Sequence, residues 1–253
     1  MLVAERHREI IAAINERGSM RVTELAQLFQ VTEETIRRDL EKLEAQGKLL
    51  RSHGGAISKE KMERETPFKE RQIANVAEKS AIAREAVKRV EANDTIMLDA
   101  STTAWEMAKL LPDIQLTVVT NAIKVAVELA DRSRVTVIST GGTLSPESLS
   151  YVGPLAERSL EGYHVNKLFF SCKGFNLETG LSDPTEWQAM LKRRMISIAD
   201  QCYVLVDHSK FGVQALATFA DVTRVHEVIT DDKVDPSVLN RIEGMGLTVK
   251  VAR

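Results

Sequence analysis

The sequence has few cysteines, few aromatic residues and no long hydrophobic run. Its two cysteines, Cys172 and Cys202, stand in apolar stretches, which is typical of buried thiols in a reducing compartment and excludes a disulfide framework. No stretch approaches the length that spans a membrane, and the start MLVAERHREI lacks the apolar core of a secretion signal. We therefore expect a cytoplasmic protein that makes no membrane contact.

An excess of charge of either sign is also missing. The 34 Lys and Arg residues stand against 36 Asp and Glu residues, which gives a formal net charge of −2. The global charge therefore does not predict a nucleic-acid partner. Basic residues gather only locally, at Lys48, Arg51, Lys59 and Lys61, with Glu60 among them. DNA affinity would depend on the placement of these few cations and on having two copies, and would fall with added salt.

Histidine is scarce too, and His7, His164 and His226 lack the spacing of metal ligands. We therefore expect neither a metal site nor a cofactor. With 253 residues, 43% of them hydrophobic, the chain can bury the core of one large domain or of two ordinary ones.

The first 58 residues contain the pattern of a winged helix-turn-helix. Apolar spacing predicts helices over residues 3–16 and 22–29, with Gly18 between them. Thr32 is a good N-cap for a third helix, because its hydroxyl can accept from the unpaired amides of the first turn. Glu33 and Glu34 suit the positive end of that helix.

The third predicted helix has one apolar stripe, formed by Ile36, Leu40 and Leu43, and it ends at Gly47. Residues 49–57 then read as a small two-stranded wing. A polar helix face with paired arginines, followed by a basic hairpin, suits a major groove and its phosphates. The expected contacts with double-stranded operator DNA come from Thr32, Glu34, Thr35, Arg37, Arg38, Lys42, Arg51 and His53.

Residues 58–78 are rich in charge and poor in aliphatic side chains, which indicates a linker. We expect a DNA-binding domain at 1–58, a linker at 59–75 and a second domain at 76–253. In the second domain, short apolar strands alternate with helices. The expected strands are 95–98, 116–119, 135–138, 167–170, 202–206, 225–230 and 247–251. This alternation predicts an α/β domain with a doubly wound, mostly parallel sheet.

Ligands of such sheets bind at the carboxyl ends of the strands. Strand ends in this sequence carry hydroxyl, amide, glycine and lysine residues. Three hydroxyl residues, Ser101, Thr102 and Thr103, begin a helix, where amides and the helix dipole favour an anion. Ordinary helix capping explains the same hydroxyls. The expected effector contacts are Asp99, Ser101, Thr102, Thr103, Asn121, Gly141, Gly142, Lys173, Gly174, Glu186, Asp207 and Lys210.

The chain also resembles the DeoR family of bacterial transcriptional regulators. The N-terminal resemblance rests on the run 31–40, on Leu43 and Gly47, and on residues 53–56. The C-terminal resemblance rests on Asp99, Thr102, Thr103, 120–121, 141–142, 151–153, 173–174, Glu186 and 207–212. The family's effector domain is similar in fold to ribose-5-phosphate isomerase and the coenzyme A transferases.

The resemblance implies that Ser101 to Thr103 hold the phosphate of a sugar, while Glu186, Asp207 and Lys210 contact its hydroxyls. Two positions depart from the usual pattern: Ser101 replaces a common glycine, and Asn166 replaces a common aspartate. Trp105 and the surroundings of Cys172 make the chain most similar to regulators of L-fucose or L-rhamnose use. A ketose 1-phosphate is the effector that this similarity implies.

These features predict a repressor of a sugar catabolic operon that binds its operator as a homo-oligomer, a dimer or tetramer, and leaves it when a sugar phosphate binds. An enzyme is the alternative: a sugar-phosphate isomerase with a DNA-binding appendage, using Glu186 as base. An activator is a third possibility, because the sequence does not set the sign of regulation. We also expect Trp187 to be a core residue, because it shares a predicted helix face with Met190 and Leu191.

Overall fold

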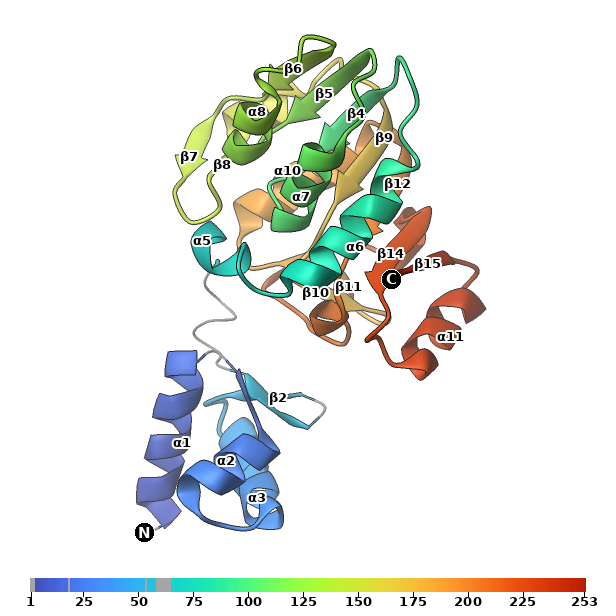
Figure 1. Ribbon diagram of the computed structural model, residues 1–253. Helices are drawn as coiled ribbons and strands as arrows, with labels where there is room; N and C mark the ends of the chain where they lie inside the picture. Colours follow the sequence, from blue (N-terminus) through green and yellow to red (C-terminus); the bar gives the residue numbers. More distant parts are fainter. Residues whose placement is uncertain (1–2, 18, 53, 58–64) are drawn as a thin grey trace. The chain divides into compact units, whose positions relative to one another are not determined.

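The computed structural model describes residues 3–17, 19–52, 54–57 and 65–253. It divides into two compact units, Met1–Glu65 and Thr66–Arg253, each of which is described by itself (Figure 1). The domain boundaries expected at 58 and 75 stay predictions. Residues 59–64 of the expected linker lie outside the described residues, as does residue 58, and residues 66–75 belong to the second unit.

The described residues of the first unit form three helices and a small antiparallel sheet. The helices are α1 (Val3–Arg17), α2 (Val22–Phe29) and α3 (Glu33–Ala45). The strands β1 (Ser19–Arg21), β2 (Leu50–Ser52) and β3 (Gly55–Ile57) pair in the order β1-β3-β2. The winged helix-turn-helix fold is thus confirmed, but the prediction of a two-stranded wing omitted β1.

A glycine allows β1 to join this sheet. A Cβ at Gly55 would lie 2.3 Å from the carbonyl oxygen of Met20, so any side chain there would force the strands apart. The core beneath the sheet includes Ile10, Ile14 and Leu25 together with the α3 stripe Ile36, Leu40 and Leu43, all 1% exposed or less. The apolar stripe predicted for the third helix is therefore confirmed.

The second unit is built on a seven-stranded sheet in which every pairing is parallel. Its strand order is β15-β14-β12-β9-β4-β5-β6. The strands are β4 (Thr95–Leu98), β5 (Leu116–Thr120), β6 (Val135–Ser139), β9 (Val165–Phe170), β12 (Ala199–Leu205), β14 (Glu227–Asp231) and β15 (Thr248–Ala252). Along the chain, β5 and β6 are added on one side of β4, and β9, β12, β14 and β15 are then added on its other side. The predicted doubly wound, parallel sheet is confirmed.

Helices cover both faces of this sheet (Figure 1). One buried cluster joins Ile96, Leu98 and Phe169 of the strands to α6 (Val76–Val87), α7 (Thr102–Leu110) and α8 (Ile123–Leu129). The other joins Met97 and Phe170 to α9 (Pro154–Ser159), α10 (Glu186–Ser197) and α11 (Pro236–Gly244). Successive strand residues thus face opposite layers, as the two-residue period of a strand requires.

Short elements lie beyond the carboxyl ends of the strands. They include the hairpin β7 (Thr143–Ser145) and β8 (Ser150–Val152), and the antiparallel sheet β10 (Gly174–Asn176), β11 (Gly180–Asp183) and β13 (Ala217–Ala220). The short helix α5 (Phe68–Arg71) precedes α6, and the 3₁₀ turn η1 (His208–Lys210) follows β12. No helix among the described residues is long and apolar enough to cross a membrane.

Candidate functional site

The polar face of α3 presents its arginines to solvent. Thr32 caps the helix as predicted, because its Oγ1 accepts a hydrogen bond of 3.3 Å from the Thr35 amide. The Arg37 and Arg38 side chains are 51% and 73% exposed. Arg37 Nη2 lies 2.6 Å from Glu33, and Arg38 Nε lies 3.2 Å from Glu34. Exposed pairs of this kind contribute little to stability, so both guanidinium groups can change partners at low cost.

The other expected DNA contacts lie on the same unit. Lys42 and Arg51 are exposed, and His53 lies outside the described residues. The Arg51 amide donates a 3.0 Å hydrogen bond to Glu44 Oε1, which fixes the start of the wing against α3. An arginine on the wing is thereby held at a set distance from the arginines of the helix.

Sequence reasoning missed Asp39, a buried carboxylate on the inner face of α3. Its oxygens accept hydrogen bonds of 2.6 Å from Arg6 Nε, and one lies 2.9 Å from His7 Nε2. Burial alone would raise the pKa of Asp39, but the hydrogen bonds and charge of Arg6 and His7 outweigh it and lower the pKa. Asp39 therefore fastens α3 to α1. The signal in the sequence was an acidic residue three positions from Ile36, on the apolar stripe.

The second candidate site lies at the carboxyl edge of the parallel sheet, where β4 and β9 run side by side. This is the position at which the strand order reverses, and such positions commonly bind ligands. Asp99 follows β4 and is 1% exposed. Its two oxygens accept 3.1 Å hydrogen bonds from the amides of Ser101 and Ser171, so it joins the ends of both central strands.

Beneath this edge, Lys192 of α10 forms a buried ion cluster that the sequence did not reveal. Its Nζ lies 2.6 Å from Asp183 Oδ2 and 3.2 Å from Asp99 Oδ2, and it donates a 2.6 Å hydrogen bond to the Ser171 carbonyl. Burial would lower the pKa of Lys192, but the two carboxylates outweigh burial and raise it. Lys192 therefore stays charged and holds Asp99 and Asp183 in place.

The hydroxyl loop at the start of α7 uses one of its hydroxyls internally. Ser101 Oγ accepts a 3.0 Å hydrogen bond from the Ala104 amide and caps the helix. Thr102 and Thr103 are 4% and 3% exposed. Helix capping therefore accounts for the Ser101 hydroxyl.

Asn121 and two of the expected glycines have packing roles. Asn121 Nδ2 donates a 3.0 Å hydrogen bond to the Tyr151 carbonyl of β8. A Cβ at Gly142 would lie 2.9 Å from Ala156 of α9, and one at Gly174 would lie 2.4 Å from the Val213 carbonyl. These two glycines let parts of the same unit approach each other. Gly141 has a φ of 60° and open space at its Cβ position.

Lysines and an arginine gather next to Asp183 and Asp207. Lys173 Nζ donates a 3.2 Å hydrogen bond to Thr66 Oγ1. Burial, reinforced by the charges of Lys210 and Arg71, lowers the pKa of Lys173 to about 8, although Asp183 and Asp207 oppose the change. Sequence reasoning missed Lys79 and Arg71, because both belong to helices that were read as linker or core.

Lys79 is buried in the same group. Its Nζ donates 2.5 Å hydrogen bonds to the carbonyls of Arg71 and Ala74. Burial lowers its pKa to about 8; Asp207 opposes this, and the charges of Lys210 and Arg71 add to it.

Asp207 is the buried acid of this group. Burial would raise its pKa, but the charge of Lys210, hydrogen bonds from Ser209 and the charge of Lys79 outweigh burial and lower it. Asn75 Nδ2 also donates a 3.0 Å hydrogen bond to Asp207 Oδ1. The structure thus brings Asp99, Lys173, Asp207 and Lys210 to one edge.

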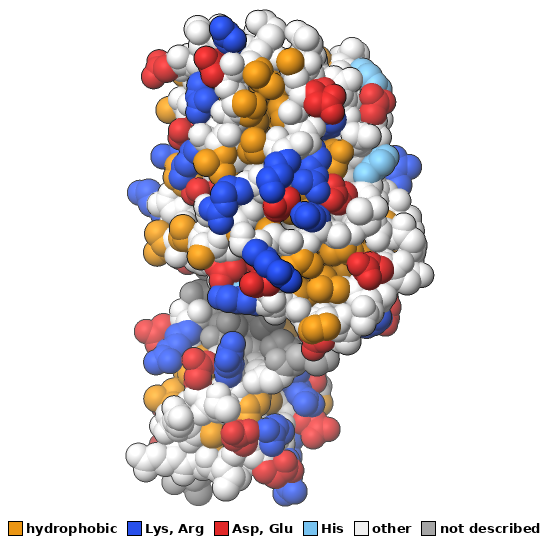
Figure 2. Space-filling view, turned by 45° about the vertical axis from the view of Figure 1, so that its right-hand side comes forward, with side chains coloured by type: hydrophobic (Ala, Val, Ile, Leu, Met, Phe, Trp, Pro, Cys, Tyr) orange, Lys and Arg blue, Asp and Glu red, His pale blue; other side chains and the backbone are white. Residues whose placement is uncertain are grey.

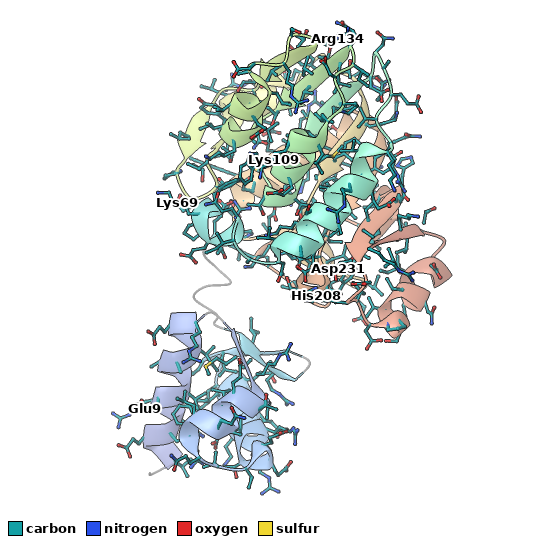
Figure 3. All side chains as sticks on the ribbon, viewed as in Figure 1. Glu9, Lys69, Lys109, Arg134, His208 and Asp231 are labelled. Atoms are coloured by element: carbon teal, nitrogen blue, oxygen red, sulfur yellow. The ribbon has the colours of Figure 1, made fainter. Side chains whose placement is uncertain are left out.

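Two expected or neighbouring residues stand apart. Glu186 is exposed in the first turn of α10 and, among the described residues, makes no hydrogen bond or ion pair with the other expected effector contacts. His208 Nδ1 lies 3.1 Å from Asp231 Oδ1 at the end of β14, so the His208 ring is paired with Asp231 (Figure 3). Trp187 is 48% exposed, so the prediction of a core residue was wrong. Acidic and basic side chains are interspersed over the face seen in Figure 2.

Comparison with known families assigns both parts of the chain. Residues 6–62 match the DeoR-like helix-turn-helix domain, and residues 74–232 match the DeoR C-terminal sensor domain. The chain belongs to the DeoR family of helix-turn-helix transcriptional regulators. The family assignment places this DeoR-family chain among regulators and not among enzymes, and it assigns DNA binding to the first unit and effector sensing to the second.

Relatives match over almost the whole chain. An uncharacterized HTH-type transcriptional regulator of Bacillus subtilis, YulB, is 56% identical over 96% of this chain and 94% of its own length. An L-fucose operon activator of Haemophilus influenzae is 38% identical over 88% of this chain and 89% of its own length. Ribose 5-phosphate isomerase A of Methanocaldococcus jannaschii is 18% identical and aligns over 55% of each chain with a TM-score of 0.41.

Proposed function

We propose that this DeoR-family protein regulates a sugar catabolic operon in the cytoplasm and that a phosphorylated sugar bound at the carboxyl edge weakens its hold on operator DNA. One observation carries the effector proposal: the buried Lys79 and the half-buried Lys173 are crowded together with Lys210 and Arg71 at this edge, and this crowding adds to burial in lowering the pKa of both lysines to about 8. Buried cations that are crowded in this way are stabilised by an added anion.

The chemistry of the edge favours a phosphate ester over a simple anion. Lys173 and Lys210 supply positive charge, and the amides at the start of α7 supply donors to the phosphate. Asp207 and Glu186 accept hydrogen bonds, which a sugar hydroxyl can donate. The relative named as an L-fucose operon activator supports a deoxyhexose pathway, so L-fuculose 1-phosphate and L-rhamnulose 1-phosphate are the first candidates.

For DNA, we propose that Arg37, Arg38 and Thr35 of α3 contact bases or phosphates in the major groove, with Lys42 and Arg51 on neighbouring phosphates. Thr32 and Glu34 position this face, and His53 completes the wing. The protein acts as a dimer or tetramer on a repeated or palindromic operator. Because linkage is reciprocal, operator DNA weakens effector binding by the same factor as the effector weakens DNA binding.

A thermal-shift panel tests the effector proposal. The full chain is heated with L-fuculose 1-phosphate, L-rhamnulose 1-phosphate, their free sugars and inorganic phosphate. A bound ligand at a hundredfold excess over its dissociation constant raises the free energy of unfolding by about 2.7 kcal/mol. We expect a shift with one phosphate ester and none with its free sugar. Absence of a shift with every phosphate ester would refute a sugar-phosphate effector.

Two lysine variants sharpen this test. Lys173→Met should lose the ligand-induced shift, because it removes a cation from the edge. Lys88→Met should keep it, because Lys88 is exposed on α6 and paired with Glu85. Equal shifts in both variants would show that the ligand binds away from Lys173.

Repression is the sign we propose, with activation as the second candidate because one relative is named as an activator. The sign follows from where the operator lies relative to the promoter, not from the chemistry of either site. A reporter fused to the target promoter, measured with and without the regulator gene, distinguishes them. Higher expression without the regulator supports a repressor, and lower expression supports an activator.

A further inference from the structure

The residues that begin the second unit are attached to the proposed effector edge. We call residues 66–79 the connecting segment; they comprise Thr66, α5, Asn75 and the first turn of α6. Thr66 directly follows Glu65, the last residue of the DNA-binding unit. Thr66 is therefore the residue at which the chain enters the second unit from the DNA-binding unit.

Two expected effector contacts hold this segment through side-chain hydrogen bonds. Lys173 Nζ donates to Thr66 Oγ1 over 3.2 Å, across 107 positions of sequence. Asn75 Nδ2 donates to Asp207 Oδ1 over 3.0 Å, across 132 positions. Both bonds join the connecting segment to the loops that follow strands of the parallel sheet.

The segment is stiff between these two bonds. Lys79 Nζ donates to the carbonyls of Arg71 and Ala74, and Arg71 Nε donates 2.9 Å to the Thr66 carbonyl. Phe68 is 3% exposed and packs edge-on against Trp105 with ring centroids 5.6 Å apart. A shift at Thr66 or Asn75 therefore moves several hydrogen-bonded residues together.

We propose that Thr66 and Asn75 couple the effector edge to the DNA-binding unit, through the exchange of Lys173 between the Thr66 hydroxyl and a bound anion. The inference rests on the proposed function of that edge. A phosphate ester offers the Lys173 ammonium an acceptor of opposite charge, which the neutral Thr66 hydroxyl does not, so the ester competes successfully with Thr66 for Lys173. The ligand then favours the arrangement in which Thr66 is released, which is the differential contact that an allosteric ligand needs.

Two variants remove the coupling side chains without removing a proposed ligand contact. Thr66→Val deletes the hydroxyl and keeps the shape of the side chain. Asn75→Gly deletes the amide and tolerates the left-handed backbone there, where φ is 50°. Their matched controls are Thr248→Val, at an exposed threonine of β15, and Asn93→Gly, at an exposed asparagine that also has a left-handed backbone, with a φ of 69°.

The experiment measures binding and coupling separately in the full chain. Binding of L-fuculose 1-phosphate, L-rhamnulose 1-phosphate and inorganic phosphate is measured by thermal shift. The DNA is the duplex that the unmodified chain selects from a random pool. Coupling is the affinity for this duplex without phosphate ester divided by the affinity at saturating ester. We expect the unmodified chain and both controls to show a ratio of at least about fivefold. Thr66→Val and Asn75→Gly should bind the ester within about threefold of the unmodified chain but bring the ratio below about twofold.

A second measurement follows the connecting segment directly. Hydrogen exchange of peptides covering residues 65–80 should accelerate when the ester binds, and Thr66→Val should show that faster exchange without ligand. Thr66→Ser restores the hydroxyl and should restore both slow exchange and coupling. This rescue separates a lost hydrogen bond from a disturbed fold.

The outcomes distinguish this inference from the proposed function. A full coupling ratio in Thr66→Val and Asn75→Gly would overturn the inference while leaving the sugar-phosphate effector in place. If no ester shifts the unmodified chain, the effector proposal fails, and the ligand-free arm decides the inference. In that arm, hydrogen exchange of residues 65–80 and affinity for the duplex are compared between Thr66→Val and Thr248→Val without ligand. Equal values in the two variants would overturn the inference, and a difference in both quantities would support it.

Discussion

The two units of this regulator use their charged residues in opposite ways. On α3, Arg37 and Arg38 are exposed and, within the part of the chain that the structure describes, pair with glutamates one turn earlier on the same helix. At the carboxyl edge, Lys192 is buried and Lys173 is half-buried, and each has a partner from a distant part of the chain, Asp99 for Lys192 and Thr66 for Lys173. Exposed pairs can be exchanged for DNA phosphates at little cost, whereas a buried pair cannot lose one partner without a large penalty.

The largest effect we expect comes from the buried cluster. Lys192→Met leaves Asp99 and Asp183 buried without their cation, and breaking a buried pair in this way costs about 3–5 kcal/mol. Urea unfolding followed by tryptophan fluorescence measures the loss in the second unit alone, because both tryptophans, Trp105 and Trp187, lie there. Lys88→Met, at an exposed pair on α6, should change stability by less than about 1 kcal/mol.

A double variant checks the reason for this loss. Adding Asp183→Asn to Lys192→Met removes one of the two uncompensated charges, so part of the stability should return. A double variant no more stable than Lys192→Met would mean that packing, and not charge, holds this edge together.

Asp39 is a buried charge in the DNA-binding unit, so buried charged groups are not confined to the second unit. Asp39→Ala should cost that unit about 3 kcal/mol, because Arg6 and His7 lose their shared acceptor. The folded pKa of Asp39 is lowered. Its contribution is therefore fully present above the unfolded pKa of about 3.9 and is lost as the pH falls through the folded value. Hydrogen exchange of peptides from α3, compared at pH 7 and pH 3, measures the loss; Asp39→Ala should lack this acid-sensitive part.

A surface variant on α3 should affect function without affecting stability. Arg38→Ala should weaken binding to the selected duplex about tenfold, while its stability and its affinity for a phosphate ester stay unchanged. Arg84→Ala is the matched control, because Arg84 is an exposed helix arginine that donates to Ser80 four positions earlier. A loss of ester binding in Arg38→Ala would show that the arginine supports the fold, against our assignment.

The same contrast explains how much of the molecule was predictable. All seven strands of the parallel sheet and the three N-terminal helices were expected from apolar period, and the Thr32 cap from its residue type. The apolar period of an element and the residue type of a cap depend only on residues close together in the sequence, so both can be recognised without the structure. The strands β1, β7, β8, β10, β11 and β13 were missed, because a strand of three or four residues is too short to display an apolar period.

Helix α10 shows why the site was less predictable than the fold. Trp187 and Met190 are 48% and 41% exposed, while Gln188 and Lys192 are buried. Gln188 Nε2 donates to Ser148 and Ser150, and Lys192 meets Asp99 and Asp183. The inward face of this helix thus carries two polar residues beside the apolar Leu191 and Met195, because the edge it meets is polar and is assembled from segments far apart in the sequence. Periodicity alone therefore assigned Trp187 to the wrong face.

The smallest effect we expect tests whether the buried lysines serve the ligand. As the pH rises from 7 to 9 through the pKa of about 8 shared by Lys173 and Lys79, both lose their protons and affinity for a phosphate ester should fall about fivefold. The ester itself is already a dianion over this range, because its second pKa is about 6. Lys173→Met should flatten the pH dependence by removing one of the two titrating groups. Titration calorimetry at pH 7, 8 and 9 measures both. Affinity that stays constant in the unmodified chain would mean that the ligand makes no use of these charges, and the buried lysines would then serve the fold, as Lys192 does.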